Sequence, residues 1–190
     1  MQVSQAAGKG RRVIFNETPL AGAFTIGLEK REDARGHFAR AFCAEEFAAH
    51  GLETTYVQAN LSGNNKAGLV RGMHFQRGND AEVKLVRCVG GAIYDVIVDN
   101  RPDSKTYLQW FGAELSGANG LMMYVPRGFA HGYQALTDTA TAFYMVSTPY
   151  TPGAEGGLHS DDPAIGIKWP LTVTDRSEKD GQWPLLERQR

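Results

Sequence analysis

The chain has 190 residues, with 20 basic and 21 acidic side chains and a formal net charge of −1. Nonspecific binding to nucleic acid or to an acidic membrane needs a broad basic surface, so this composition argues against both partners. The length suits one domain whose core is large enough to fold without disulfides. We therefore expect a single domain over residues 1–190, with 1–12 as a flexible leader.

The two cysteines, Cys43 and Cys88, lie in apolar segments that have the pattern of regular structure. This predicts reduced, buried thiols and a cytoplasmic protein. The sequence has no run of about 18 apolar residues, and the polar first 12 residues lack the apolar stretch of a secretory signal.

Glycine, proline and asparagine divide the chain into short extended segments. Strands are predicted at 13–15, 23–28, 37–42, 54–60, 67–75, 83–89, 92–99, 106–115, 121–125, 128–136 and 141–148. One short helix is predicted at 44–50, because acidic residues occupy its first turn and Gly51 follows its end. The stretches 90–91 and 117–120 have the residues of hairpin loops. Many short strands at this spacing predict an all-β fold, an antiparallel sandwich or barrel.

From Pro149 onward the strand pattern stops and proline and glycine become frequent. This part of the chain, and about 165–190 in particular, is predicted to pack over the body as a tail instead of joining a sheet.

The stretch 68–76 is a predicted strand that carries Arg71 and His74 where aliphatic residues would pack better. His74-x-Gln76 and the later motif that ends in His131 resemble the two motifs of the cupin jelly roll, in which metal-binding members use a His-x-His pair. Here Gln76 replaces the second histidine, and an amide oxygen is a poor ligand for a transition metal. We therefore expect no metal.

Five ordered segments resemble more closely the dTDP-4-dehydrorhamnose 3,5-epimerase family, with a match from about Ala21 to Asp180. They are Arg71–Gln76, Lys84–Cys88, Asp95–Arg101, Pro126–Gly132 and 162–170. The resemblance implies a cupin-like jelly-roll β-sandwich with short helices and a C-terminal packing segment. It implies cofactor-free epimerisation at C3, C5 or both of a dTDP-4-keto-6-deoxy-hexose in deoxysugar or polysaccharide biosynthesis. It also implies a homodimer paired through edge strands, with the N-terminal third contributing most.

The resemblance assigns four catalytic positions. His74 is the base, Asp180 orients and charge-stabilises it, and Tyr144 is the acid on the opposite face of the carbon. Lys84 stabilises the enolate, and the period of two along its strand places it on the same side as Val86. The alternatives are a barrel histidine held by structural hydrogen bonds, a solvated lysine and a core tyrosine.

The resemblance also assigns substrate-binding positions: Arg35 and Arg71 for the diphosphate, and Gln58, Asn60 and His131 as polar contacts. His131 has a structural hydrogen-bonding role as its alternative. Two departures from the family pattern affect the nucleotide side: Arg40 stands where a glutamate is common, and Pro149 precedes Tyr150 where an aromatic pair is often found.

Two other functions compete with the epimerase. One is a cupin that binds a sugar nucleotide without catalysis, and the joint presence of His74, Lys84, Tyr144 and Asp180 argues against it. The other is a metal-dependent cupin isomerase or dioxygenase, which Gln76 disfavours.

Overall fold

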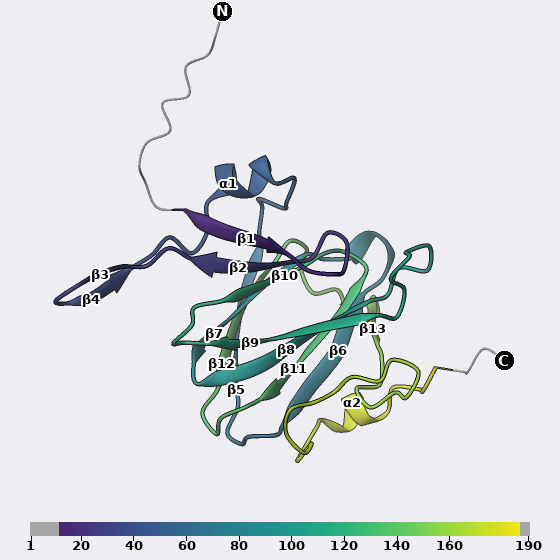
Figure 1. Ribbon diagram of the computed structural model, residues 1–190. Coiled ribbons are helices and arrows are strands. Elements are labelled where there is room, and N and C mark those ends of the chain that lie inside the picture. Colours follow the sequence, from purple (N-terminus) through teal and green to yellow (C-terminus); the bar gives the residue numbers. More distant parts are fainter. Residues whose placement is uncertain (1–11, 187–190) are drawn as a thin grey trace, which may run out of the picture.

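The computed structural model describes residues 12–186, which form two antiparallel β-sheets packed face to face (Figure 1). The six-stranded sheet has the order β1 (Val13–Glu17), β2 (Phe24–Leu28), β10 (Met122–Val125), β7 (Lys84–Gly90), β12 (Thr141–Val146) and β5 (Gln58–Gly63). The five-stranded sheet has the order β13 (Glu155–Gly157), β6 (Val70–Gln76), β11 (Phe129–Ala135), β8 (Ala92–Asp99) and β9 (Trp110–Ser116). This confirms the predicted all-β, cupin-like sandwich. Of the predicted leader, only Arg12 lies within the described residues.

The main core fills the space between the sheets. Val86 of β7 and Met123 of β10 pack in one cluster with Ile97 of β8 and Phe129 of β11, and each is at most 3% exposed. Burial of this apolar surface is the dominant favourable term in folding. Because alternate residues of a strand face the same side, Lys84 lies on the inner side of β7 with Val86.

Both predicted hairpin loops are instead connections between the two sheets. Gly90 ends β7 of the six-stranded sheet and Gly91 leads into β8 of the five-stranded sheet, and residues 117–120 lie in the connection from β9 back to β10. Gly91 has φ +65°, and a Cβ there would lie 2.3 Å from Thr137 Oγ1, so the crossing needs a glycine. The glycine pattern predicts a turn, but it does not predict which strand the next strand pairs with.

Several strand boundaries differ from the prediction. The segment 37–42 is a strand only in β4 (Gly36–Phe38), which pairs with β3 (Arg31–Asp33) in a separate hairpin that projects from the body (Figure 1). The strand predicted at 54–60 is β5, shifted toward the C-terminus by its pairing with β12. The strand predicted at 106–115 begins at Trp110, because Leu108, with φ 60°, belongs to the preceding turn.

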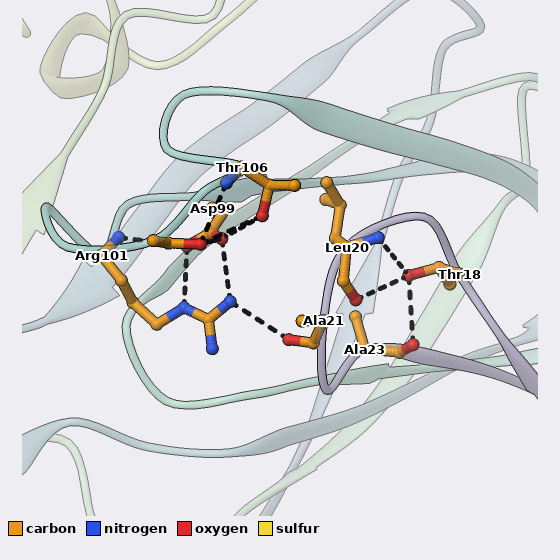
Figure 2. Close-up of polar contacts among 8 residues, drawn as sticks. Thr18, Leu20, Ala21, Ala23, Asp99, Arg101 and Thr106 are labelled. Atoms are coloured by element: carbon orange, nitrogen blue, oxygen red, sulfur yellow. Dashed lines mark hydrogen bonds and ion pairs between the residues drawn. The ribbon is translucent and has the colours of Figure 1, made fainter.

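That turn is held by Asp99, which is fully buried (Figure 2). Its carboxylate accepts hydrogen bonds from Arg101, Ser104 and Thr106 at 2.5–2.8 Å. Burial would raise the pKa of Asp99, but these hydrogen bonds outweigh it and hold the pKa well below its usual range. Arg101 also donates to the carbonyl of Ala21, so this cluster joins the 100–109 turn to the β1–β2 loop.

The helix predicted at 44–50 is α1 (Ala44–Ala49), which buries Phe47. His50 follows its end, is exposed, and stacks on Phe15 at 3.9 Å between ring centroids. Cys88 is buried as expected, but Cys43, which occupies the N-cap position of α1 without a side-chain capping hydrogen bond, is only half-buried.

One segment of the tail joins a sheet, and a later segment packs against the outside of that sheet. Glu155–Gly157 joins the five-stranded sheet as β13 beside β6, which contradicts the prediction for that segment, because its backbone completes the edge of β6. Farther on, Ile165, Ile167 and Trp169 pack on the outer face of this sheet. A second short element follows, α2 (Glu178–Gly181). Within residues 12–186 no helix is long and apolar enough to cross a membrane.

Candidate active site

Two adjoining hollows open between the sheets and share three lining residues, His74, Lys84 and Tyr144. The larger has a volume of about 370 Å³. The smaller has a volume of about 240 Å³. His74 comes from β6 of the five-stranded sheet, whereas Lys84 and Tyr144 come from β7 and β12 of the six-stranded sheet. The two sheets therefore supply different reactive groups to one space.

The position of His74 depends on a close approach of β6 and β11. Gly72 has φ +116°, and a Cβ there would lie 2.6 Å from the Gly132 Cα and 2.8 Å from the His131 carbonyl oxygen. A glycine is therefore required. The same pairing sets His74 opposite His131 in the ladder.

Asp180 holds the imidazole of His74 in a fixed orientation. Its Oδ1 lies 2.6 Å from His74 Nε2, and its Oδ2 accepts a hydrogen bond from the Gly72 backbone N–H at 3.1 Å. Ser177 Oγ accepts from the Asp180 N–H and caps α2, which presents the carboxylate. With the carboxylate as acceptor, Nε2 carries the proton and Nδ1 is the basic nitrogen.

The carboxyl of Asp180 is only 3% exposed. Burial would raise its pKa, but the hydrogen bond and charge of His74 and the donors from Gly72 and Ser177 outweigh that effect and lower the pKa. Asp180 is therefore an ionised acceptor at neutral pH, as orientation of the histidine requires.

The ammonium of Lys84 is held by two acceptors. Nζ donates to the His74 carbonyl oxygen at 3.2 Å and forms an ion pair with Glu82 Oε1 at 3.2 Å. The lysine side chain is 11% exposed, so the solvated alternative for this residue is wrong. Since an ammonium has three N–H donors, one is left for a ligand.

Tyr144 lines both hollows from β12. Burial raises the pKa of its hydroxyl, Tyr133 and Glu82 add to that effect, and Arg71 opposes it. The phenol therefore keeps its proton throughout the neutral range and can donate it. The hydroxyl of Tyr144 and the imidazole of His74 thus line the same space from different sheets.

His131 lines the smaller hollow, and its Nε2 lies 2.8 Å from Asp95 Oδ1. Asp95 is fully buried. His131 therefore makes the structural hydrogen bond given above as its alternative and also borders the space that a ligand would occupy.

Three of the other predicted binding residues reach the cavity. Gln58 and Asn60 line the larger hollow, and Gln58 donates to the Asn60 side chain at 2.9 Å. Arg71 lines the smaller hollow, where Asn64 and the Gly63 carbonyl fix its guanidinium.

Arg35 does not reach the cavity of its own chain. It lies in the β3–β4 hairpin with a side chain 90% exposed, paired with Asp33 at 2.6 Å. The sequence match identified Arg35 by its position in the motif, but it could not show that the hairpin around Arg35 points away from the cavity.

Gln76 lines the larger hollow with an amide that is fully engaged. It donates to the carbonyls of Asp80 and Pro149 and accepts from the Thr151 N–H. Its role is to join β6 to two neighbouring loops. In the described part of the chain, no three His, Cys, Asp or Glu side chains group so that they could hold a metal ion.

The two departures from the family pattern have local partners. Arg40 donates to Glu46 of α1 at 2.5 Å. Tyr150 lines the larger hollow, and its hydroxyl donates to Glu155.

Sequence reasoning missed Glu82, Glu155 and Lys179 as cavity residues. Glu82 and Glu155 line the larger hollow, Lys179 lines the smaller one, and Glu155 and Lys179 form an ion pair. The signal for Glu82 was its place two residues before Lys84, on the same side of an extended segment. No comparable signal marks Glu155, whose position depends on the tail.

Known proteins resemble this chain in sequence and in structure. A family model described as dTDP-4-dehydrorhamnose 3,5-epimerase matches residues 17–188. The dTDP-4-dehydrorhamnose 3,5-epimerase of Sinorhizobium fredii is 43% identical over 173 residues, which are 90% of this chain and 89% of the relative.

Two solved structures extend the comparison. The Bacillus anthracis dTDP-4-dehydrorhamnose 3,5-epimerase, with TDP and PPi bound, has a TM-score of 0.89 at 36% identity and covers 92% of this chain and 100% of its own. The Legionella pneumophila dTDP-6-deoxy-D-glucose-3,5-epimerase, in complex with dTDP-4-keto-L-rhamnose, has a TM-score of 0.86 at 34% identity and covers 92% of this chain and 93% of its own.

Proposed function

This chain belongs to the dTDP-4-dehydrorhamnose 3,5-epimerase family, and we propose that it epimerises C3, C5 or both of a dTDP-4-keto-6-deoxy-hexose without a cofactor. The observation that carries this proposal is the placement of a base and an acid on opposite sheets of one cavity. His74 on β6 and Tyr144 on β12 both line the two hollows. Inversion of a carbon needs a proton removed from one face and returned to the other.

In the first step, His74 Nδ1 removes the proton from the carbon next to the C4 ketone. The C–H electron pair moves to form the enolate, and the negative charge develops on the C4 oxygen. Lys84 offers that oxygen its remaining N–H donor, which lowers the barrier because the charge is matched where it forms. The carboxylate of Asp180, 2.6 Å from Nε2, stabilises the imidazolium that results.

In the second step, Tyr144 returns a proton to the opposite face of the same carbon, and the enolate electrons reform the ketone. The raised pKa of the tyrosine supports this role, since the hydroxyl is protonated before the step. Exchange with solvent then returns a proton to the tyrosinate and removes one from His74. The same pair of groups serves C3 and C5 if the sugar turns between the two events.

The nucleotide diphosphate needs cationic and polar partners at the edge of this space. Arg71 supplies a guanidinium with a fork suited to two phosphate oxygens, and Gln58 and Asn60 supply amides in the larger hollow. The relative that was solved with TDP and PPi, and the one solved with a dTDP-keto sugar, support this ligand class.

We further propose that the working form is a homodimer, in which the β3–β4 hairpin of one copy reaches the cavity of the other. The hairpin projects from the body (Figure 1). It carries Phe38 and Arg35, whose side chains are exposed. Arg35 can contact a diphosphate only in this way. Light scattering should give a mass twice the 20.8 kDa of one chain at micromolar concentration. A monodisperse monomer with full activity would refute the dimer and the role of Arg35 together.

The variant Arg35→Ala tests that role directly. It should raise KM with kcat unchanged, because the arginine binds ground state and transition state alike. Arg31→Ala, on the same hairpin, is the matched control and should leave both parameters unchanged.

The two free cysteines support a location in the reducing cytoplasm, and the two packed sheets of residues 12–186 support a single domain.

The decisive experiment is incubation of the protein with dTDP-4-keto-6-deoxyglucose in deuterated water, followed by NMR of the sugar. Deuterium should enter C3, C5 or both, together with inversion at the labelled carbon. His74→Ala should abolish both signals. A parent protein that binds dTDP but gives neither exchange nor inversion would instead be a binding protein, and the proposed reaction would be wrong.

A further inference from the structure

Glu82 is a buried carboxylate in the wall of the larger hollow, beside the three residues that carry the proposed reaction. Its side chain is 6% exposed, and it lines the hollow together with His74, Lys84 and Tyr144. The Oε1 atom pairs with Lys84 Nζ at 3.2 Å. The Oε2 atom is buried and has no hydrogen-bond partner among the described residues.

The ion pair with Lys84 explains the position of Oε1 but not the buried Oε2, which is unpartnered in the part of the chain that the structure describes. A buried ammonium needs an anionic partner, and Oε1 provides it. An ionised carboxylate, however, accepts at both oxygens, and a buried acceptor without a donor is costly. The neighbouring Gln76 shows the contrast, because all of its polar atoms are used by backbone groups.

We propose that Glu82 is a specificity-determining residue, whose second oxygen accepts a hydrogen bond from a hydroxyl group of the bound nucleotide sugar. This inference rests on the proposed function and deepens it. The terminal torsion of a glutamate is broad, so a modest rotation of the carboxylate can bring Oε2 toward the hollow. An acceptor-only group favours a hydroxyl and disfavours a phosphate or a ketone oxygen at that point.

Two hydroxyl sources fit this chemistry: the hydroxyls of the hexose ring and the 3′-hydroxyl of the deoxyribose. Both belong to the same ligand, and both are donors that a carboxylate can accept. The experiment separates them, because free dTDP contains the deoxyribose hydroxyl and lacks the hexose.

The variant Glu82→Gln removes the acceptor at the second oxygen and also the negative charge that faces Lys84, so the measurements with dTDP and with a substrate analogue are needed to separate the two effects. Lys84 has only donors, so the amide oxygen of a glutamine turns toward it and the NH2 group takes the place of Oε2. The lysine keeps a partner, whereas the hydroxyl loses its acceptor. Loss of a hydrogen bond to a charged group should lower kcat/KM for dTDP-4-keto-6-deoxyglucose by about 10- to 100-fold.

The binding of free dTDP shows whether the hydroxyl belongs to the deoxyribose or to the hexose. If the deoxyribose is the donor, Glu82→Gln weakens binding of free dTDP by a similar factor in calorimetry. If the hexose is the donor, dTDP binding stays unchanged, and a substrate analogue lacking that hydroxyl reacts equally well with parent and variant. The parent alone should also prefer the natural substrate over this analogue, which tests the inference even if the variant folds poorly.

Glu114→Gln is the matched control, because Glu114 is an exposed carboxylate on β9 outside both hollows. It should leave dTDP binding and kcat/KM unchanged. Glu82→Gln with both quantities within twofold of the parent would overturn the inference. A parent protein without exchange at C3 or C5 is a different result, since it removes the proposed reaction, and the dTDP arm still reports on Glu82.

Discussion

The substitution Asp180→Asn tests the orientation of the base with almost no change of shape. The carboxylate accepts hydrogen bonds from His74 Nε2 at 2.6 Å and from the Gly72 N–H at 3.1 Å. An amide has one acceptor and one donor end, so it can satisfy only one of them. If its NH2 group faces the Gly72 N–H, a buried donor is left without an acceptor, at a cost of about 1–3 kcal/mol.

The less costly arrangement turns the NH2 group toward His74 Nε2. That nitrogen must then be the acceptor, so the proton moves to Nδ1, which is the nitrogen that should take the substrate proton. The variant thus holds the histidine in the tautomer that cannot act as a base. A general base contributes about 10²- to 10⁴-fold, so kcat should fall by a factor in that range, while KM changes little.

The assay is solvent deuterium incorporation at C3 and C5 of the 4-keto sugar, with dTDP affinity and thermal unfolding measured alongside. Glu178→Gln is the control, because it removes one charge from the same helix at an exposed position. It should behave as the parent. If Asp180→Asn kept more than about a tenth of the parent exchange rate, a loss below the range given for a general base, the proposed role of Asp180 would be wrong.

Three further predictions follow from the same geometry. Tyr144→Phe should keep solvent exchange but lose most of the inversion, because removal and return of the proton use different groups. Lys84→Ala should slow exchange and inversion together, since both need the enolate; the two signals are read in one NMR experiment. The hydrogen-bond partners of Asp180 lower its pKa in the folded state. The parent should therefore have a larger free energy of unfolding than Asp180→Asn above about pH 4, and this difference should shrink as the pH falls further.

Each of these has a matched control or a contrary outcome. Tyr107→Phe and Lys105→Ala change exposed residues outside the two hollows and should leave exchange and inversion unchanged. Full inversion by Tyr144→Phe would mean that another group or a water is the acid. Exchange that survives Lys84→Ala would remove the lysine from the enolate step. A difference in stability that stays constant down to pH 2 would show that Asp180 does not form its ion pair in the folded state.

The sequence predicted the strands better than their partners. Turn residues and the extended segments between them located most strands, including β8 at its observed bounds, because that pattern is local in the sequence. It could not reveal that Gly91 leads into the opposite sheet, since a turn has the same residues in either case. It also could not predict β13, whose three residues become a strand only because the edge of β6 is open to them.

For the candidate site, the family resemblance identified four residues that line the cavity, His74, Lys84, Tyr144 and Asp180, and one that does not, Arg35. His74, Lys84 and Tyr144 each lie on a strand whose period determines which way the side chain points. Arg35 matched the motif but lies on a hairpin that leads away from its own cavity. Glu82 was overlooked because an acidic residue at the start of a strand usually faces solvent.

The contact between Asp180 and His74 joins residues 106 positions apart. During synthesis, β12 and the cavity wall that it completes therefore leave the ribosome before Asp180 does. A nascent chain at that stage has the strands that carry Lys84 and Tyr144, but its histidine has no carboxylate to hold it. We therefore expect a chain that ends before Ser177 to show little or no solvent exchange at the sugar carbons, because it lacks the carboxylate that orients His74.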